Sequence, residues 1–363
     1  MSLQKPLKYT SLHSEHLNLK AKMVNFANWE MPIQYEGILA ETKSVRSKAG
    51  IFDVSHMGRV RITGEKSEWF LSKITSFDPK EMSVNQAKYG LICNEHGGII
   101  DDIILYKKTQ DEYLLIPNAS NTTEVLNWID KFRFKKDLNI EDITEITTMI
   151  SLQGPLALNT LNNLIQNPID LKRFRSTSLQ YQGNNIFIGR TGYTGENGFE
   201  IISENSTAPS IWKHLLQLGA VPIGLGARDI LRLEAGLPLH GNEISKSINP
   251  YQANLERFVS LNRDDYIANL SLEKIFEKEK DISLIGFKVF DRIIPRHHNK
   301  ILDLSHIEIG YVTSGSYSPH LDMSIGMGYV QTNKSAISNK INLEIRNKIV
   351  EAEITKLPFY KRS

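Results

Sequence analysis

The alternation of apolar and polar positions divides the chain before residue 275 into repeated groups of strands and helices. Residues 99–106 and 111–118 each predict a strand, joined by a polar turn, and residues 121–132 place apolar side chains at helical spacing. The same order recurs between residue 147 and the helix that Gly219 ends. Strand pairs that alternate with helices predict an antiparallel α+β fold.

Two further segments carry residues of chemical interest. Residues 37–50 predict a helix that Gly50 ends, and residues 51–63 predict a strand that follows it directly and contains His56. On a strand, His56 is interpreted as a satisfied core group rather than a catalytic one. Residues 224–236 predict another helix between two glycines.

The pattern changes near residue 275. A charged segment is followed by short strands, and residues 340–355 alternate in the manner of a hairpin. We therefore expect two regions, residues 1–275 and residues 276–363. A length of 363 residues allows each region its own core.

Composition excludes several classes of function. The chain has 43 Lys and Arg against 41 Asp and Glu, a net charge of +2, which gives no sign of nucleic-acid binding. It has no apolar run long enough to span a membrane, and its first residues do not resemble a signal peptide. We expect a soluble, cytoplasmic protein. The lone Cys93 excludes an internal disulfide and a multi-cysteine metal site, and is expected to be a small buried hydrophobe.

Common catalytic motifs are missing. There is no phosphate-binding P-loop and no G-x-S-x-G elbow, and the GLGARD stretch lacks the third glycine of a dinucleotide fingerprint. His297 and His298 are adjacent in a polar loop, where two rings cannot easily share one metal ion. We therefore expect no metal site.

Two adjacent carboxylates stand inside the predicted strand 99–106. Because neighbouring side chains of a strand point to opposite faces, Asp101 and Asp102 face different sides, and both sides are apolar. Burying a carboxylate is costly unless it is paired or kept for a task. The residues alone favour a structural ion pair and leave a functional role open.

Two other stretches combine glycine or arginine with carboxylates. Gly192, Gly195 and Gly198 recur every three residues ahead of Glu200, which indicates either a tight hairpin loop or close approach to a flat ligand. A carboxylate such as Glu200 can accept two parallel N–H bonds from the amidine-like edge of a pterin. Arg228 and Arg232 lie on one face of the predicted helix, with Asp229 close enough to pair with Arg232. By default this is a solvated face with a salt bridge. Alternatively, the two guanidinium groups bind the carboxylates of a ligand.

Taken together, the motifs resemble the T-proteins of the glycine cleavage system, a family of aminomethyltransferases. The motifs are, in order, FANWEMPIQY, FDVSHMG, GGIIDDIILY, LQGP, RTGYTGENGFE, GLGARDILRLEAGLPLHGNE, TSGSYSP and LPFYK. They run from about residue 10 to residue 361 in register, which makes the resemblance specific.

The resemblance implies a fold, a reaction and partners. The fold would be a three-domain cloverleaf around a central hole for tetrahydrofolate, with two interleaved α+β domains and a C-terminal β-barrel. An aminomethyl group on the lipoyl arm of the H-protein would be split to give ammonia, 5,10-methylenetetrahydrofolate and a reduced lipoyl dithiol. Neither a metal nor a flavin is implied.

The resemblance also assigns residues. The catalytic aspartate corresponds to Asp102, beside the N5/N10 edge of the folate, with Asp101 as the structural partner. The residues implied to contact tetrahydrofolate are Tyr193, Glu200, Tyr89, Met57, Asn118, Arg228 and, from the C-terminal domain, Arg296.

The chain departs from the family pattern at a few positions, which concern packing and donor preference rather than reaction class. These are Asn28, where family members usually have Gly, Thr42 in place of His, His240 in place of Tyr, and Gln252 and Arg257 in place of the common acidic and Trp positions. Two rival functions remain on this scaffold. One is a tetrahydrofolate-dependent demethylase of a small methylated amine or sulfonium compound. The other is a folate-binding protein without transferase activity, which would be expected to lose the aspartate pair and the RTGYTG loop.

Overall fold

The computed structural model describes residues 6–133, 138–166 and 168–362. The chain divides into two compact units. Unit 1 comprises Met1–Glu68, Lys80–Tyr89 and Ile103–Asp229, and unit 2 comprises Trp69–Pro79, Gly90–Asp102 and Ile230–Ser363. Each unit is built from segments far apart in the sequence, so neither corresponds to a single stretch of chain.

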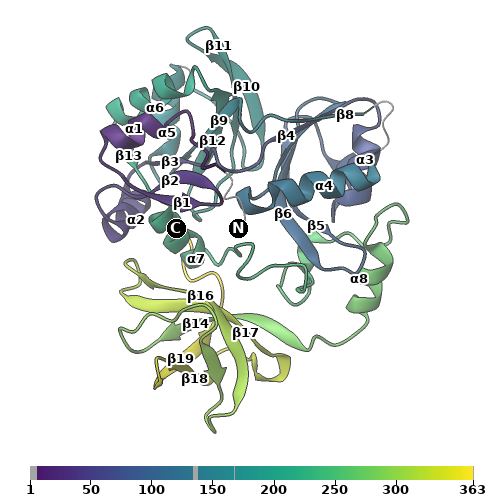
Figure 1. The fold of residues 1–363 in the computed structure, drawn as a ribbon, viewed down its shortest axis with the longest axis vertical. Helices are drawn as coiled ribbons and strands as arrows, with labels where there is room; N and C mark the ends of the chain where they lie inside the picture. Colours follow the sequence, from purple (N-terminus) through teal and green to yellow (C-terminus); the bar gives the residue numbers. More distant parts are fainter. Residues whose placement is uncertain (1–5, 134–137, 167, 363) are drawn as a thin grey trace. The chain divides into compact units, whose positions relative to one another are not determined.

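A first sheet has the strand order β10-β11-β12-β9-β3-β13. Its strands are β3 (Gly50–Asp53), β9 (Thr147–Gln153), β10 (Ser176–Tyr181), β11 (Asn184–Gly189), β12 (Gly198–Glu204) and β13 (Val221–Pro222). Neighbours are antiparallel except β13, which runs parallel to β3. Helices α5 (Ala157–Ile165) and α6 (Ala208–Gln217) pack against it (Figure 1). Their apolar stripes share one core with the sheet, which includes the fully buried Trp212.

A second sheet has the order β5-β6-β7-β4-β8. Its strands are β4 (Val60–Thr63), β5 (Gln86–Cys93), β6 (Ile99–Lys107), β7 (Glu112–Ile116) and β8 (Asn139–Asp142). Helices α3 (Ser67–Ile74) and α4 (Thr122–Phe132) lie between these strands in the sequence. The chain thus leaves the first sheet after β3, builds the second, and returns at β9. This confirms the prediction of two interleaved antiparallel α+β parts.

The N-terminal part adds helix α1 (His13–Asn18), the hairpin of β1 (Lys22–Phe26) and β2 (Trp29–Gln34), and helix α2 (Ile38–Ser47). Ala27 and Asn28 form the hairpin turn with φ of 50° and 66°. Asn tolerates this left-handed backbone better than most residues. Its side-chain amide also donates to the carbonyl of Pro6 at 3.0 Å, which explains how Asn28 replaces the usual glycine.

The predictions for residues 37–63 are partly wrong. Helix α2 ends at Ser47, and Gly50 opens β3 instead of ending the helix. Gly50 is required there because a Cβ would lie 2.7 Å from side-chain carbons of Val45 and Ile223. The predicted strand 51–63 breaks between β3 and β4, so His56 lies in a turn.

Unit 2 contains a closed barrel with the order β14-β17-β16-β15-β18-β19. Its strands are β14 (Ile282–Val289), β15 (Lys300–Leu302), β16 (Glu308–Ser318), β17 (Met323–Gln331), β18 (Lys340–Ile345) and β19 (Lys348–Thr355). Inward-facing aliphatic side chains and Phe287 fill it. The predicted hairpin 340–355 is present, and both of its turn residues, Arg346 and Asn347, have positive φ. The C-terminal barrel is therefore confirmed, while the division at residue 275 stays a proposal.

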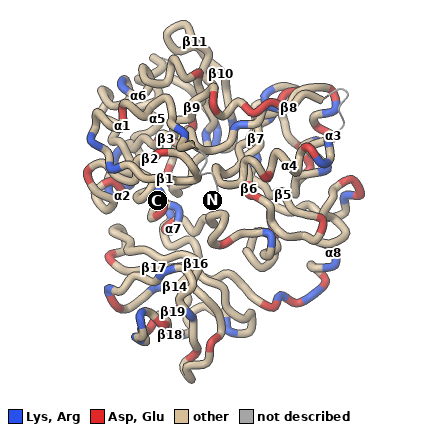
Figure 2. The backbone as a smooth tube through the Cα atoms, in the orientation of Figure 1, with Lys and Arg blue, Asp and Glu red and all other residues tan. Residues whose placement is uncertain are grey.

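Helix α7 (Leu225–Glu234) matches its prediction, and α8 (Asn269–Phe276) occupies part of the charged segment. Acidic and basic residues are interspersed along the backbone without a long run of one sign (Figure 2). Within the described residues, no helix is both long and apolar enough to cross a membrane.

Candidate active site

Glu200 is the centre of a buried hydroxyl and carboxylate cluster in unit 1. It lies on β12 opposite Ser151 of β9 and Gly189 of β11, and only 8% of its surface is exposed. Its Oε2 accepts a hydrogen bond from the Thr191 hydroxyl at 2.5 Å and a longer one from the Tyr106 hydroxyl at 3.4 Å. Burial raises the pKa of Glu200, while Thr191, Arg228 and Tyr106 act to lower it.

Tyr106 belongs to this cluster although the sequence did not single it out. Its hydroxyl lies 2.6 Å from that of Thr191, and its ring packs on Gly189, where a Cβ would meet the hydroxyl at 2.4 Å. Burial raises its pKa, so the hydroxyl remains a donor. Along β6, Tyr106 shares a face with Asp102, four residues earlier. This alternation was the signal that could have identified it.

Arg228 lies in the part of α7 that belongs to unit 1. Its guanidinium carbon is 4.8 Å from the centre of the Tyr193 ring, a cation–π contact. Burial lowers its pKa, whereas the charge of Glu200 and then the Tyr193 hydroxyl act to raise it. Its Nη1 is buried and has no hydrogen-bond partner among the described residues. Unit 1 therefore brings Glu200, Tyr193 and Arg228 together.

The glycine-rich loop is shaped by Gln153 of the LQGP motif. A Cβ at Gly192 or Gly198 would lie 2.1 Å or 2.3 Å from the Gln153 amide group. That amide donates to Ser151 Oγ and the Thr191 carbonyl, and accepts from the Thr194 hydroxyl. The two glycines thus admit a planar side chain of the protein itself, which favours the tight-loop interpretation.

His56 and Met57 lie in the turn between β3 and β4. Two buried ionic side chains, Arg59 and Asp53, hold this turn in place. Arg59 donates to the carbonyls of Ser55 and Met57, to that of Thr144 before β9, and to that of Thr147, the first residue of β9. On the other side, Asp53 accepts from the Ser55 amide and hydroxyl, so the turn is fixed at both ends.

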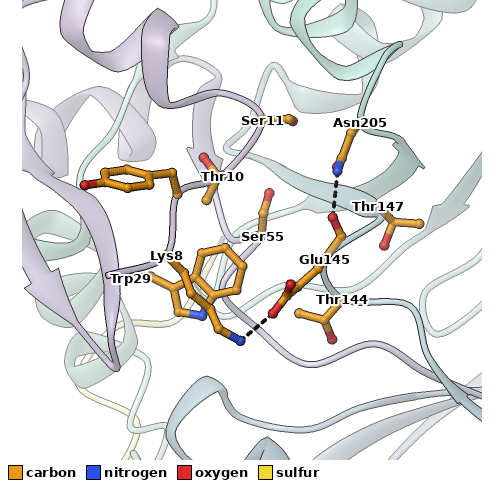
Figure 3. A pocket seen from close by; sticks show the side chains of 10 residues that line it. Lys8, Thr10, Ser11, Trp29, Ser55, Thr144, Glu145, Thr147 and Asn205 are labelled. Atoms are coloured by element: carbon orange, nitrogen blue, oxygen red, sulfur yellow. Dashed lines mark hydrogen bonds and ion pairs between the residues drawn. The ribbon is translucent and has the colours of Figure 1, made fainter. Parts of the chain in front are cut away.

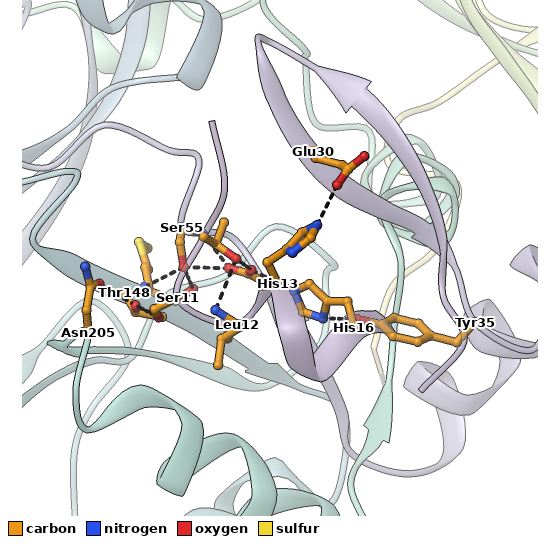
Figure 4. A network of polar contacts seen from close by, with 12 residues as sticks. Ser11, Leu12, His13, His16, Glu30, Tyr35, Ser55, Thr148 and Asn205 are labelled. Carbon is orange, nitrogen blue, oxygen red and sulfur yellow. Dashed lines mark hydrogen bonds and ion pairs between the residues drawn. The ribbon is translucent and has the colours of Figure 1, made fainter. Parts of the chain in front are cut away.

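Asp53 also connects the turn to the N-terminal segment. Figure 4 shows this polar network with Ser55, His16 and Tyr35 labelled. Its Oδ2 lies 2.8 Å from His16 Nε2 and accepts from Thr10 at 2.6 Å, and His16 Nδ1 lies 2.9 Å from the Tyr35 hydroxyl. Burial alone would raise the pKa of Asp53, but the bonds from His16, Ser55 and Thr10 hold it at about 2. The carboxylate is therefore ionised at neutral pH.

His56 itself differs from the expected satisfied core histidine. It is only 4% exposed, and its Nδ1 is buried without a hydrogen-bond partner in the described part of the chain. Burial, together with the charges of Arg228 and Arg59, lowers its pKa to about 3 against the opposing effect of Asp53. Its ring meets that of Phe26 edge to face, with centroids 5.4 Å apart. The imidazole is neutral at physiological pH.

A cavity of about 200 Å³ lies beside the same turn, with Ser55 in its wall (Figure 3). Lys8 and Glu145 form an ion pair in its lining at 2.5 Å. The hydroxyls of Thr10, Ser55 and Thr147 in the wall already donate within the protein. We assign no ligand to this cavity.

The remaining predicted site residues lie in both units. Met57, Tyr89 and Asn118 are partly exposed positions of unit 1, in the turn after β3, on β5 and after β7. Asp102 and Arg296 belong to unit 2, on β6 and in the loop after β14. Asp101 is fully buried, whereas Asp102, on the opposite face of the strand, is partly exposed. Their proposed roles remain predictions.

The expectation that Arg232 lies on a solvated helix face is wrong. It is 1% exposed and pairs with Glu243 at 2.9 Å, so it is not on a solvated face. Cys93 is a buried thiol, as expected, and burial raises its pKa to about 12. His297 Nδ1 contacts the Thr313 carbonyl, and the part of the chain that is described contains no cluster of potential metal ligands.

Three of the departures from the family pattern have local partners. The buried Thr42 hydroxyl donates to the Ile38 carbonyl. The side-chain amide of Gln252 donates to Asp281 and accepts from the backbone N–H of Asn249, and a neutral amide can do both. Arg257 stacks over Phe258 at 4.7 Å. His240, which is bridged to Ile244, has no evident structural reason for replacing tyrosine.

Comparison with known proteins decides the family. The profile of the GCVT N-terminal domain matches residues 12–263, and that of the glycine cleavage T-protein C-terminal barrel domain matches residues 283–361. The chain belongs to the glycine cleavage T-protein family. The predicted family is thereby confirmed.

Relatives of this T-protein match over nearly its whole length. Aminomethyltransferases of Chloroherpeton thalassium and Thermosipho melanesiensis are 41% and 40% identical to it. Each match covers 98% of this chain, and it covers 100% and 98%, respectively, of the relative's length. The crystal structure of glycine cleavage system aminomethyltransferase T from Bartonella henselae superposes with a TM-score of 0.92 at 32% identity, covering 98% of both chains. The predicted enzyme class, aminomethyltransferase, is confirmed with the family.

Proposed function

We propose that this T-protein transfers the methylene carbon of an aminomethyl-lipoyl H-protein to tetrahydrofolate. The C–S bond of the aminomethylated arm breaks, ammonia leaves, and the products are 5,10-methylenetetrahydrofolate and a dihydrolipoyl H-protein. The observation that carries the proposal is the buried cluster of Glu200, Tyr106 and Thr191 beside Arg228 and Tyr193. It occurs in a chain that matches aminomethyltransferases from end to end.

The cluster suits the recognition of a pterin ring. The Glu200 carboxylate can accept two parallel N–H bonds from the ring's amidine edge, a strong charge-assisted arrangement. Tyr106 and Thr191 donate to the same carboxylate and so fix its orientation before the ligand arrives. Tyr193 supplies an aromatic face, and the remaining proposed contacts are Met57, Tyr89, Asn118, Arg228 and Arg296.

Asp102 is proposed as the catalytic residue. Cleavage of the C–S bond generates a positive iminium carbon, which a preorganised carboxylate stabilises more strongly than water would. The same carboxylate can hold the attacking folate nitrogen in place. The alternation of β6, which sets Asp102 on the face of Tyr106, supports this assignment.

The proposed reaction uses tetrahydrofolate as a substrate and a lipoylated H-protein as partner, and it needs neither metal nor flavin. It is consistent with a cytoplasmic location and with a folate-binding region at residues 1–275 followed by a barrel domain at 276–363.

The deciding experiment measures methylenetetrahydrofolate formation from tetrahydrofolate with three donors in parallel: aminomethyl-lipoyl H-protein, dimethylglycine and a methylated sulfonium compound. We expect turnover with the lipoyl donor alone. Turnover only with a free small molecule would reassign the site to a demethylase. Folate binding without turnover of any donor would indicate a protein that lacks transferase activity.

A further inference from the structure

Four buried nitrogen atoms in unit 1 have no hydrogen-bond partner among the described residues, and two of them, His56 Nδ1 and Arg228 Nη1, belong to ionisable side chains. An unsatisfied buried polar group costs about 1–3 kcal/mol, so native proteins seldom keep one without a partner such as a ligand or an ordered water. The two side chains also lie close enough to interact electrostatically. Two such atoms in one neighbourhood indicate a shared polar ligand group.

The two ionic side chains that hold the turn of His56 are extensively hydrogen-bonded. In the same turn, Arg59 uses its donors on four carbonyls and the Thr147 hydroxyl. Asp53 accepts bonds from His16, Thr10 and Ser55. Loose packing of the turn therefore does not explain the unpaired Nδ1. The turn is held rigidly, and its His56 Nδ1 has no partner among the residues that the structure describes.

The chemistry of the two nitrogens limits what they can bind together. Arg228 Nη1 can only donate, and a neutral imidazole donates from Nδ1 when its single proton is there. Two donors in one neighbourhood suit a shared acceptor oxygen. Since Arg228 also interacts electrostatically with Glu200, this oxygen would lie near the group that Glu200 binds. In a pterin ring, the 4-oxo group is next to the N3–H of the amidine edge.

We propose that His56 and Arg228 together bind the 4-oxo oxygen of the pterin, which makes His56 a specificity-determining residue. This inference rests on the proposed function. Glu200 would select the donor edge of the ring, and His56 with Arg228 would select the adjacent acceptor. A ring that carries a 4-amino group in place of the 4-oxo group would present donors to donors and be rejected.

The test compares binding of tetrahydrofolate and its 4-amino-4-deoxy analogue by isothermal titration calorimetry. We expect the wild-type protein to prefer tetrahydrofolate by at least tenfold. His56→Phe removes the donor but keeps a planar ring, and should weaken tetrahydrofolate binding roughly tenfold to a hundredfold with little effect on the analogue. His56→Asn keeps an amide donor near the position of Nδ1 and should retain most of the discrimination.

Kinetics and a matched control separate recognition from structure. With tetrahydrofolate, His56→Phe should raise KM while kcat stays within a few-fold, because binding rather than chemistry is affected. His214→Phe, the same change on α6, should alter neither ligand's affinity. An equal loss for both ligands in His56→Phe, no discrimination by wild type, or no rescue by His56→Asn would overturn the inference. A wild-type protein that binds no tetrahydrofolate would refute the proposed function instead.

Discussion

The carboxylate of Glu200 can bind the N–H edge of a ligand only while it is ionised. Because burial raises its pKa above the usual value for glutamate, protonation begins at a higher pH than for an exposed residue. We expect tetrahydrofolate affinity to be constant above this pKa. It should fall as the pH decreases through the pKa, approaching tenfold per pH unit.

The measurement is the dissociation constant of tetrahydrofolate between pH 5 and pH 8 for wild type and Glu200→Gln, since the amide keeps the shape without the charge. The variant should bind about 1–3 kcal/mol more weakly at pH 8 and lose the pH dependence that wild type shows. Equal affinities at pH 8 would mean that the pterin is recognised elsewhere.

Asp102 has a different predicted signature because its role is in the chemical step. Asp102→Asn should reduce turnover by on the order of a hundredfold or more and leave tetrahydrofolate affinity within roughly tenfold. Single-turnover rates with aminomethyl-lipoyl H-protein measure the first quantity and calorimetry the second. Turnover close to wild type would remove Asp102 from the catalytic role.

At the scale of single residues, the sequence predicts the chemistry of the site better than its surroundings. The spacing of RTGYTGENGFE and the resemblance pointed to Glu200 and Tyr193. They missed Tyr106 and the unpaired nitrogen of His56. Both omissions have a physical reason, since hydrogen-bond satisfaction depends on contacts with residues distant in the chain.

At the scale of elements, the glycine-rich loop owes its form to Gln153. Gly198→Ala would bring a methyl group to 2.3 Å from the Gln153 amide, which is buried and held by three hydrogen bonds. We expect a loss of about 1–3 kcal/mol in the free energy of unfolding, measured by urea denaturation. The φ of Gly198 is not among the positive ones, so backbone strain does not contribute.

A double-mutant cycle identifies the cause. Gln153→Ala alone should destabilise the protein, because it leaves a cavity and removes hydrogen bonds. In that background, however, Gly198→Ala should cost much less, because the clashing amide is gone. Additive effects of the two substitutions would show that the glycine is needed for some other reason.

Element boundaries follow the sequence where the pattern is local. The hairpin of β18 and β19 was predictable because its alternation and its turn are adjacent in the chain. The break between β3 and β4 was not, because residues 51–63 form a continuous mixed run. The buried Arg59 and Asp53 that stabilise the turn take partners from residues 10, 16, 144 and 147.

At the scale of the whole molecule, periodicity predicts the class of fold but not the path of the chain. Alternating strand pairs and helices indicated antiparallel α+β structure, which the two sheets confirm. The return of the chain from β8 of one sheet to β9 of the other was predicted only by resemblance. Pairing between β3 and β9 joins residues about a hundred positions apart, which no local pattern encodes.

A buried ionic network within unit 2 joins the end of α7 to the barrel. Arg232 pairs with Glu243 at 2.9 Å, and Glu243 also accepts from the hydroxyls of Thr313 and Ser314 on β16. Arg232 and Glu243 are at most 1% exposed. Removing one partner leaves the other as an uncompensated buried charge. Arg232→Met should therefore lower the free energy of unfolding by roughly 3–5 kcal/mol.

Removing both charges should cost much less than the sum of the single changes. In Arg232→Met with Glu243→Gln, neither side chain is charged, and Gln still accepts from the Thr313 and Ser314 hydroxyls. Urea denaturation of the full chain, followed by far-UV circular dichroism, measures all three variants. Arg61→Met is the control. It breaks an ion pair with Glu112 at 3.0 Å in which the arginine is half exposed, so it should lower the free energy of unfolding by about 1 kcal/mol or less. If Arg232→Met cost no more than this control, the network would not hold α7 to the barrel, and the burial of its charges would need another explanation.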